Sequence, residues 1–108
     1  MNGQQKHFET LLENLAIEAG LTPIIEYDDS NLGTVLLQDP KTSNFVVAAI
    51  FDFRPSGVTL KSRIPGTSNP AIQGIHVDYL RSADSGSKVV SFVKDLVRWG
   101  KQRKAALA

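Results

Sequence analysis

The sequence predicts one α+β domain of two layers, in which a helix near each end of the chain covers the same face of an antiparallel sheet of four or five strands. Three observations lead to this class. Apolar residues recur at helical spacing near both ends, and the short β-type segments between them are joined by turns too short for parallel crossovers. The middle segment 44–53 holds the longest apolar run of the chain, which is typical of a strand at the centre of a sheet.

The first element is predicted to be a helix over residues 4–19. Gly20 follows it, at the position where a glycine commonly closes a helix. The apolar positions of this helix follow the i, i+3, i+4, i+7 spacing, and they are Phe8, Leu11, Leu12, Leu15, Ala16 and Ala19. The opposite face is predicted to be an exposed acidic one, which carries Glu9, Glu13 and Glu18.

The next four elements are predicted to be strands at 24–27, 33–38, 44–53 and 58–64. Clusters of Asp, Asn, Ser, Pro and Gly separate them and supply turn chemistry. Because each connection is only a few residues long, neighbouring strands should pair antiparallel and form a meander.

Residues 71–80 are assigned to a fifth strand, which follows a loop at 65–70 that contains two prolines and a glycine. Ile75, Val77 and Tyr79 alternate as they would in a strand, and Gly74 argues against a helix.

The last element is predicted to be a helix that begins at Ser85 or Ser87, either of which can cap it, and that runs to about Trp99 or beyond. Gly100 is a candidate end of the regular helix. Residues 101–108 would then form either a basic last turn or a frayed tail of a single domain that spans residues 1–108.

One face of the predicted sheet has no cover within the chain. Because the run 45–51 is apolar at consecutive positions, both of its faces should be shielded from water. A second copy is the simplest cover for so short a chain, so the sequence predicts a homodimer that associates through its sheet face. Phe51 and Phe53, which share one side of the strand, are the predicted dimer-face residues.

The charges are divided unevenly along the chain. Residues 1–54 hold three basic and eight acidic residues, and residues 55–108 hold nine basic and three acidic ones. This asymmetry indicates an anionic partner for the second half, or association between unlike faces. The residues assigned to partner binding are Lys61, Arg63, Arg98, Lys101, Arg103 and Lys104. Nucleic-acid binding through these bases is the alternative hypothesis, since phosphate contacts need only such charge.

No motif in the sequence indicates a catalytic, metal or cofactor site. Cysteine is absent, which excludes thiol chemistry, disulfides and cysteine-ligated zinc, and the glycines do not form a phosphate-binding pattern. His76 and Asp78 would project from one strand face and could form a proton relay, so a small enzyme is the third hypothesis. An ordinary surface pair is the favoured interpretation of these two residues.

These observations together favour a non-enzymatic macromolecule-binding or adaptor module, a homodimer that binds itself or another protein. A cytoplasmic location is expected, because the polar start of the chain does not resemble a signal peptide and no apolar stretch reaches the length of a membrane span.

Overall fold

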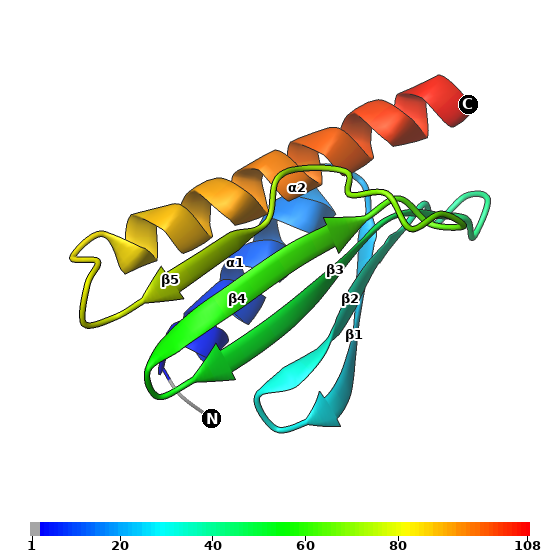
Figure 1. Cartoon of the computed structure of the whole chain (residues 1–108). Helices are drawn as coiled ribbons and strands as arrows, with labels where there is room; N and C mark the ends of the chain where they lie inside the picture. Colours follow the sequence, from blue (N-terminus) through cyan, green and yellow to red (C-terminus); the bar gives the residue numbers. More distant parts are fainter. Residues whose placement is uncertain (1–2) are drawn as a thin grey trace.

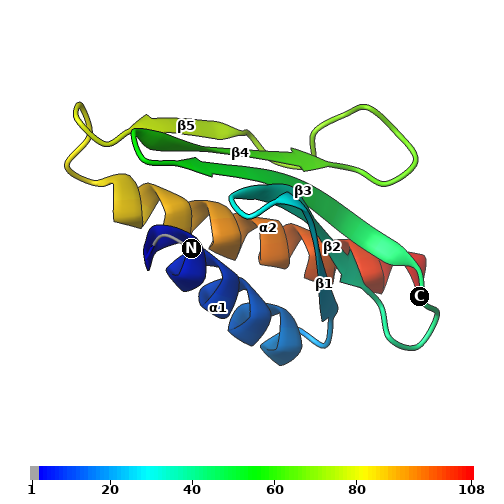
Figure 2. The ribbon, with the colours of Figure 1, turned by 90° about the horizontal axis from the view of Figure 1, so that it is seen from below.

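Five strands form one antiparallel sheet in the order β1-β2-β3-β4-β5, and both helices lie on the same face of it (Figures 1 and 2). The computed structural model describes residues 3–108, and it confirms the predicted two-layer α+β class. In chain order the elements are α1 Gly3–Glu18, β1 Thr22–Asp29, β2 Leu32–Gln38, β3 Phe45–Arg54, β4 Gly57–Arg63, β5 Ile75–Asp78 and α2 Ser85–Leu107. No helix of the described part is long and apolar enough to cross a membrane.

A glycine closes α1, as the sequence predicted. Gly20 has a φ of 75°, and its amide donates a hydrogen bond to the carbonyl of Ile17 (3.0 Å). The amide of Leu21 donates to the carbonyl of Ala16 (2.9 Å). This pair of bonds satisfies carbonyls that the helix leaves free, and it turns the chain sharply into β1.

The predicted central strand is the middle of the sheet, where β3 pairs with both β2 and β4. An irregularity in the pairing with β2 leaves one extra residue, Val46, in β3. As a result Val46 and Val47 are both buried, and both lie close to Gly100 of α2.

The fifth strand exists but is shorter than the predicted segment 71–80. Ser62 of β4 explains where it begins, because its Oγ accepts hydrogen bonds from the amides of Ala71 (3.0 Å) and Ile72 (2.8 Å). The same hydroxyl donates to the carbonyl of Ile72 (2.8 Å). A side chain therefore takes the place of the strand ladder at residues 71–72, and regular pairing starts only at Ile75.

The second helix extends beyond Trp99, the longer of the two predicted extents, because α2 continues through Gly100 to Leu107. Residues 101–107 are helical rather than a frayed tail. Gly100 is buried where α2 crosses the sheet, and a Cβ there would lie 3.1 Å from Cγ1 of Val47 and 3.2 Å from Cδ1 of Leu21. The glycine thus permits close packing of helix on strand and does not act as a stop signal.

The expected serine cap of α2 is also absent. Asp84 is the N-cap residue, and its side chain makes no capping hydrogen bond. The Ser87 hydroxyl donates to the carbonyl of Asp84 (3.0 Å), and Lys88 lies 3.8 Å from the Asp84 carboxylate.

Enlarging Gly100 should destabilise the fold. Gly100→Leu is expected to lower the free energy of unfolding by about 1–3 kcal/mol, because the new side chain meets Val47 and Leu21 in a closely packed region. Urea denaturation followed by circular dichroism measures the loss. Gln102→Leu, at an exposed position of the same helix, is the matched control and should change stability by less than about 0.5 kcal/mol. An unchanged midpoint in Gly100→Leu would contradict the packing role.

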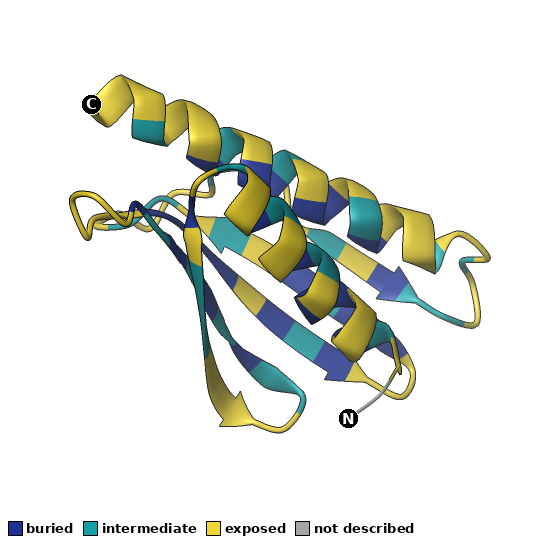
Figure 3. Ribbon diagram, turned by 180° about the vertical axis from the view of Figure 1, so that it is seen from behind, coloured by how far each residue is buried: buried dark blue, intermediate teal, exposed yellow. Residues whose placement is uncertain are grey.

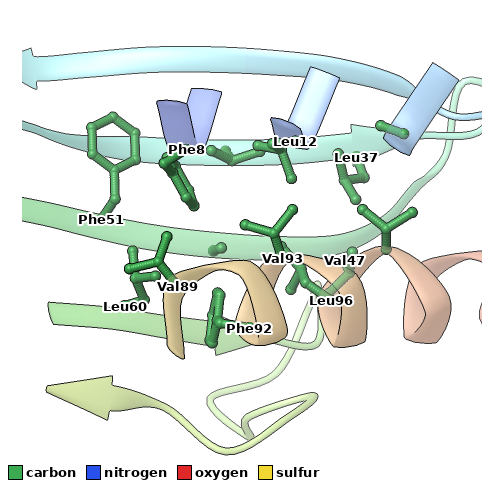
Figure 4. Packing of buried hydrophobic residues seen from close by; sticks show 14 of the residues in the cluster. Phe8, Leu12, Leu37, Val47, Phe51, Leu60, Val89, Phe92, Val93 and Leu96 are labelled. Carbon is green, nitrogen blue, oxygen red and sulfur yellow. The ribbon is translucent and has the colours of Figure 1, made fainter. Parts of the chain in front are cut away.

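The core lies between the sheet and the two helices. Phe8 and Leu12 reach into it from α1, and Val89, Phe92 and Leu96 reach into it from α2 (Figure 4). Exposed and buried residues alternate along both helices, as expected for amphipathic helices packed on a sheet (Figure 3).

Candidate interaction surface on the open face of the sheet

The side of the sheet opposite the helices carries no helix or strand of residues 3–108, and we call it the open face (Figure 2). Successive side chains of a strand point to opposite sides, so the position of the helices decides which residues lie on this face. The fully buried residues Ala49, Phe51 and Phe53 share the helix side of β3.

The predicted dimer-face residues Phe51 and Phe53 are therefore on the wrong side of the strand, and this assignment is corrected. Both rings are fully buried against Phe8 of α1, with ring centroids 5.7 Å and 5.3 Å from the Phe8 ring. Figure 4 shows Phe51 and Phe8 side by side in the core. The helix that contributes Phe8 covers the face on which the two phenylalanines lie, so a second copy cannot reach them.

The open face instead presents the other set of alternating residues. Strand pairing aligns Leu36 of β2 with Ile24 of β1 and Ala48 of β3. Phe45 pairs with Gln38 at one end of the sheet, and Ile50 follows two residues after Ala48. We call these residues the apolar patch: Ile24, Leu36, Phe45, Ala48 and Ile50. The side chains of Phe45 and Ile50 are each 42% exposed, and Ile24 and Leu36 are half-buried.

Opposite charges flank the apolar patch. One row across the sheet reads Glu26, Thr34, Ile50 and Lys61, in order from β1 to β4. The next row ends at Arg63, which is paired with Ala48. Glu26 and Lys61 form no ion pair within the described residues. In these two rows the open face is thus acidic on its β1 side, apolar in the middle and basic on its β4 side, and Asp52, which pairs with Arg54, lies further along β3 on the same face.

The six bases assigned to partner binding do not form one surface. Lys61 and Arg63 project from the open face, whereas the other four belong to α2, on the opposite side of the sheet (Figures 1 and 2). Lys104 donates a hydrogen bond from Nζ to the carbonyl of Gly20 (3.0 Å), so it holds α2 to the end of α1. A single nucleic-acid strand would have to wrap around the domain to contact all six.

His76 and Asp78 project from the open face of β5, next to Thr59 of β4, as their spacing predicted. They are not bonded to each other. Nδ1 of His76 lies 2.8 Å from Oγ1 of Thr59, and the Asp78 carboxylate accepts a hydrogen bond from the amide of Leu80 (2.9 Å). The pocket beside them has a volume of about 130 Å³, well below the roughly 300–1,000 Å³ of ordinary small-molecule sites. In the described part of the chain no cluster of three His, Asp or Glu residues could hold a metal ion.

A larger groove, which the sequence did not indicate, lies between β5 and α2. Its volume is about 660 Å³, and Ile75 of β5 and Phe92 of α2 supply part of its apolar lining. Two of its acids are already engaged within α2 or at its start, because Asp84 pairs with Lys88 and Asp95 pairs with Arg98.

Glu9, predicted on the exposed face of the first helix, is buried beneath β1, and this expectation is corrected. The hydroxyl of Tyr27 donates a hydrogen bond to the Glu9 carboxylate. This hydrogen bond, followed by partial desolvation of the hydroxyl, raises the pKa of Tyr27 to about 12. The pair ties α1 to the outer strand of the sheet.

The raised pKa predicts an alkaline transition. A hydroxyl whose pKa is higher in the folded than in the unfolded state contributes stability fully below pH 10.0, and this contribution is lost as the pH rises towards about 12. Absorbance at 295 nm should therefore show Tyr27 titrating near pH 12 in a Tyr79→Phe variant, which leaves Tyr27 as the only tyrosine. The same titration in Glu9→Gln should move towards 10.0, and a native midpoint already at 10.0 would contradict the contact.

Comparison of the chain with models of protein families, with curated proteins and with solved structures found no match.

Proposed function

We propose that this chain is a non-enzymatic macromolecule-binding module that forms a homodimer through the open face of its sheet. The observation that carries the proposal is the apolar patch. Phe45 and Ile50, both large and substantially exposed, lie on a sheet face that no described helix or strand covers. Contiguous apolar surface of this kind is typical of sites where proteins bind one another.

A second copy suits this surface because it brings an identical apolar patch. Burial of apolar surface stabilises association by about 25 cal/mol per Å², and a twofold interface buries every patch residue twice. The exposed bases of α2, among them Arg98 and Lys101, remain on the outside of such a dimer. They provide a second surface, which suits an adaptor that joins its own dimer to an acidic protein partner.

The solution mass tests the proposal directly. Sedimentation equilibrium at micromolar concentration should give twice the chain mass of 11.8 kDa, and nuclease treatment should not change it. A mass of 11.8 kDa at every concentration would contradict the homodimer. A mass that falls only after nuclease treatment would support bound nucleic acid instead.

A further inference from the structure

The charges on the open face distinguish between the ways in which two copies can stack. This inference rests on the proposed homodimer and concerns its geometry. When two identical sheets pack face to face, the twofold axis lies between them, in the plane of the interface. The axis can run across the strands or along them, and the two arrangements place different strands opposite each other.

An axis across the strands places every strand over its own counterpart. Glu26 of β1 would then face the β1 strand of the second copy, which carries Glu26 and the exposed Asp28. Lys61 and Arg63 of β4 would likewise face β4 of the second copy. Like charges would oppose each other along both sides of the interface, which is destabilising.

An axis along the strands, placed between β2 and β3, gives the opposite result. It brings β1 of one copy over β4 of the other, because these strands lie equally far from the axis in the sheet order. Glu26 then faces Lys61 of the second copy, and the twofold symmetry repeats the pair. Within the same row Thr34 faces Ile50, so the unlike charges enclose the apolar centre.

Side-chain sizes in the neighbouring row agree with this arrangement. That row reads Ile24, Leu36, Ala48 and Arg63 from β1 to β4. The axis places the large Leu36 over the small Ala48, and Ile24 over the aliphatic stem of Arg63. Large side chains opposite small ones let two surfaces interdigitate, and a long basic side chain can cover apolar surface with its stem.

We propose that two copies of this chain stack open face to open face about a twofold axis that runs along the strands between β2 and β3, with Glu26 of each copy paired to Lys61 of the other. The dimer then has four layers, with the helices outside and two sheets inside. The strand β5 lies beyond the four overlapping strands, so His76 stays outside the contact.

Charge reversal tests the pairing. Glu26→Lys and Lys61→Glu should each raise the dimer dissociation constant by about tenfold, because each places two like-charge contacts in the interface. The double variant Glu26→Lys/Lys61→Glu restores opposite charges, and its dissociation constant should return to within about threefold of the native value. Glu18→Lys and Lys94→Glu make the same charge changes at exposed positions of α1 and α2, and they should leave association unchanged.

Analytical ultracentrifugation of these variants separates the failure of this geometry from the failure of the homodimer. If the native chain is a dimer and the double variant's dissociation constant rises by the product of the two single-variant increases, the Glu26–Lys61 pairing is wrong. The homodimer itself would still be supported. Tighter association of the neutral variant Glu26→Gln would also overturn the pairing, because relief of repulsion is expected only for the axis across the strands. A native chain that is monomeric throughout would remove the proposed homodimer itself.

Discussion

Replacing Phe51 with alanine should lower the free energy of unfolding by about 3–5 kcal/mol. The ring is fully buried and packs against three other rings, with centroid distances of 5.7 Å to Phe8, 6.0 Å to Tyr27 and 6.2 Å to Phe53. Removing it leaves a cavity where α1 meets the sheet, a region that both layers hold in place and that cannot collapse fully. Urea denaturation at a concentration where the chain is monomeric measures the loss.

Ile50 is the matched control for this experiment, because it is the next residue along the chain and points to the opposite face. Its side chain is 42% exposed, so Ile50→Ala should cost the monomer less than about 1 kcal/mol. The contrast between adjacent positions tests which side of β3 the helices cover. Comparable losses at the two positions would show that the assignment of the faces is wrong.

The sequence alone could not predict which side of β3 faces the helices. The class, the order of the elements and the central place of β3 follow from periodicity and turn residues, which are local properties. Which of the two alternating sets of β3 side chains faces the core cannot be predicted in this way, because residues 45–51 are apolar in both sets. Only the packing of Phe8 from α1 identifies the side of Phe51 as the core.

The other corrections have the same origin in contacts between distant residues. The local sequence pattern predicts that Gly100 ends a helix. In the structure its lack of a side chain allows α2 to pack closely against Val47, which is far away in sequence. The local pattern predicts that Glu9 is an exposed acid, but Glu9 is buried and accepts a hydrogen bond from the hydroxyl of Tyr27. In each case tertiary structure overrides a sound local signal.

The residues of the apolar patch were even harder to predict from the sequence, because they come from three different strands. Ile24, Leu36 and Ala48 are neighbours only because the strands pair in one particular register. A shift of one residue in either pairing would move whole sets of side chains to the other face. The apolar run did indicate that a second face needed a cover, which is the part of the site that the sequence could predict.

The apolar patch should therefore be sensitive to a polar, uncharged residue at its centre. Ile50→Asn is expected to raise the dimer dissociation constant by about tenfold or more, because each interface loses two apolar contacts and must desolvate two amide groups, each of which faces only the hydroxyl of Thr34. Asparagine carries no charge, so the neighbouring Lys61 cannot neutralise it and hide the effect. Sedimentation velocity over a range of concentrations measures the change.

His76→Asn places the same side chain on the open face at β5, outside the four strands that overlap in the proposed dimer. It should leave the dissociation constant within about twofold of the native value, since its surroundings stay exposed to solvent. Unfolding midpoints of both variants, measured on the monomer, separate a weaker interface from a weaker fold. Equal weakening of the dimer by both substitutions would place the contact towards β5 and away from the apolar patch. A dimer that Ile50→Asn leaves intact would show that the two copies meet elsewhere, because the loss of two apolar contacts at the centre of the interface cannot be neutral.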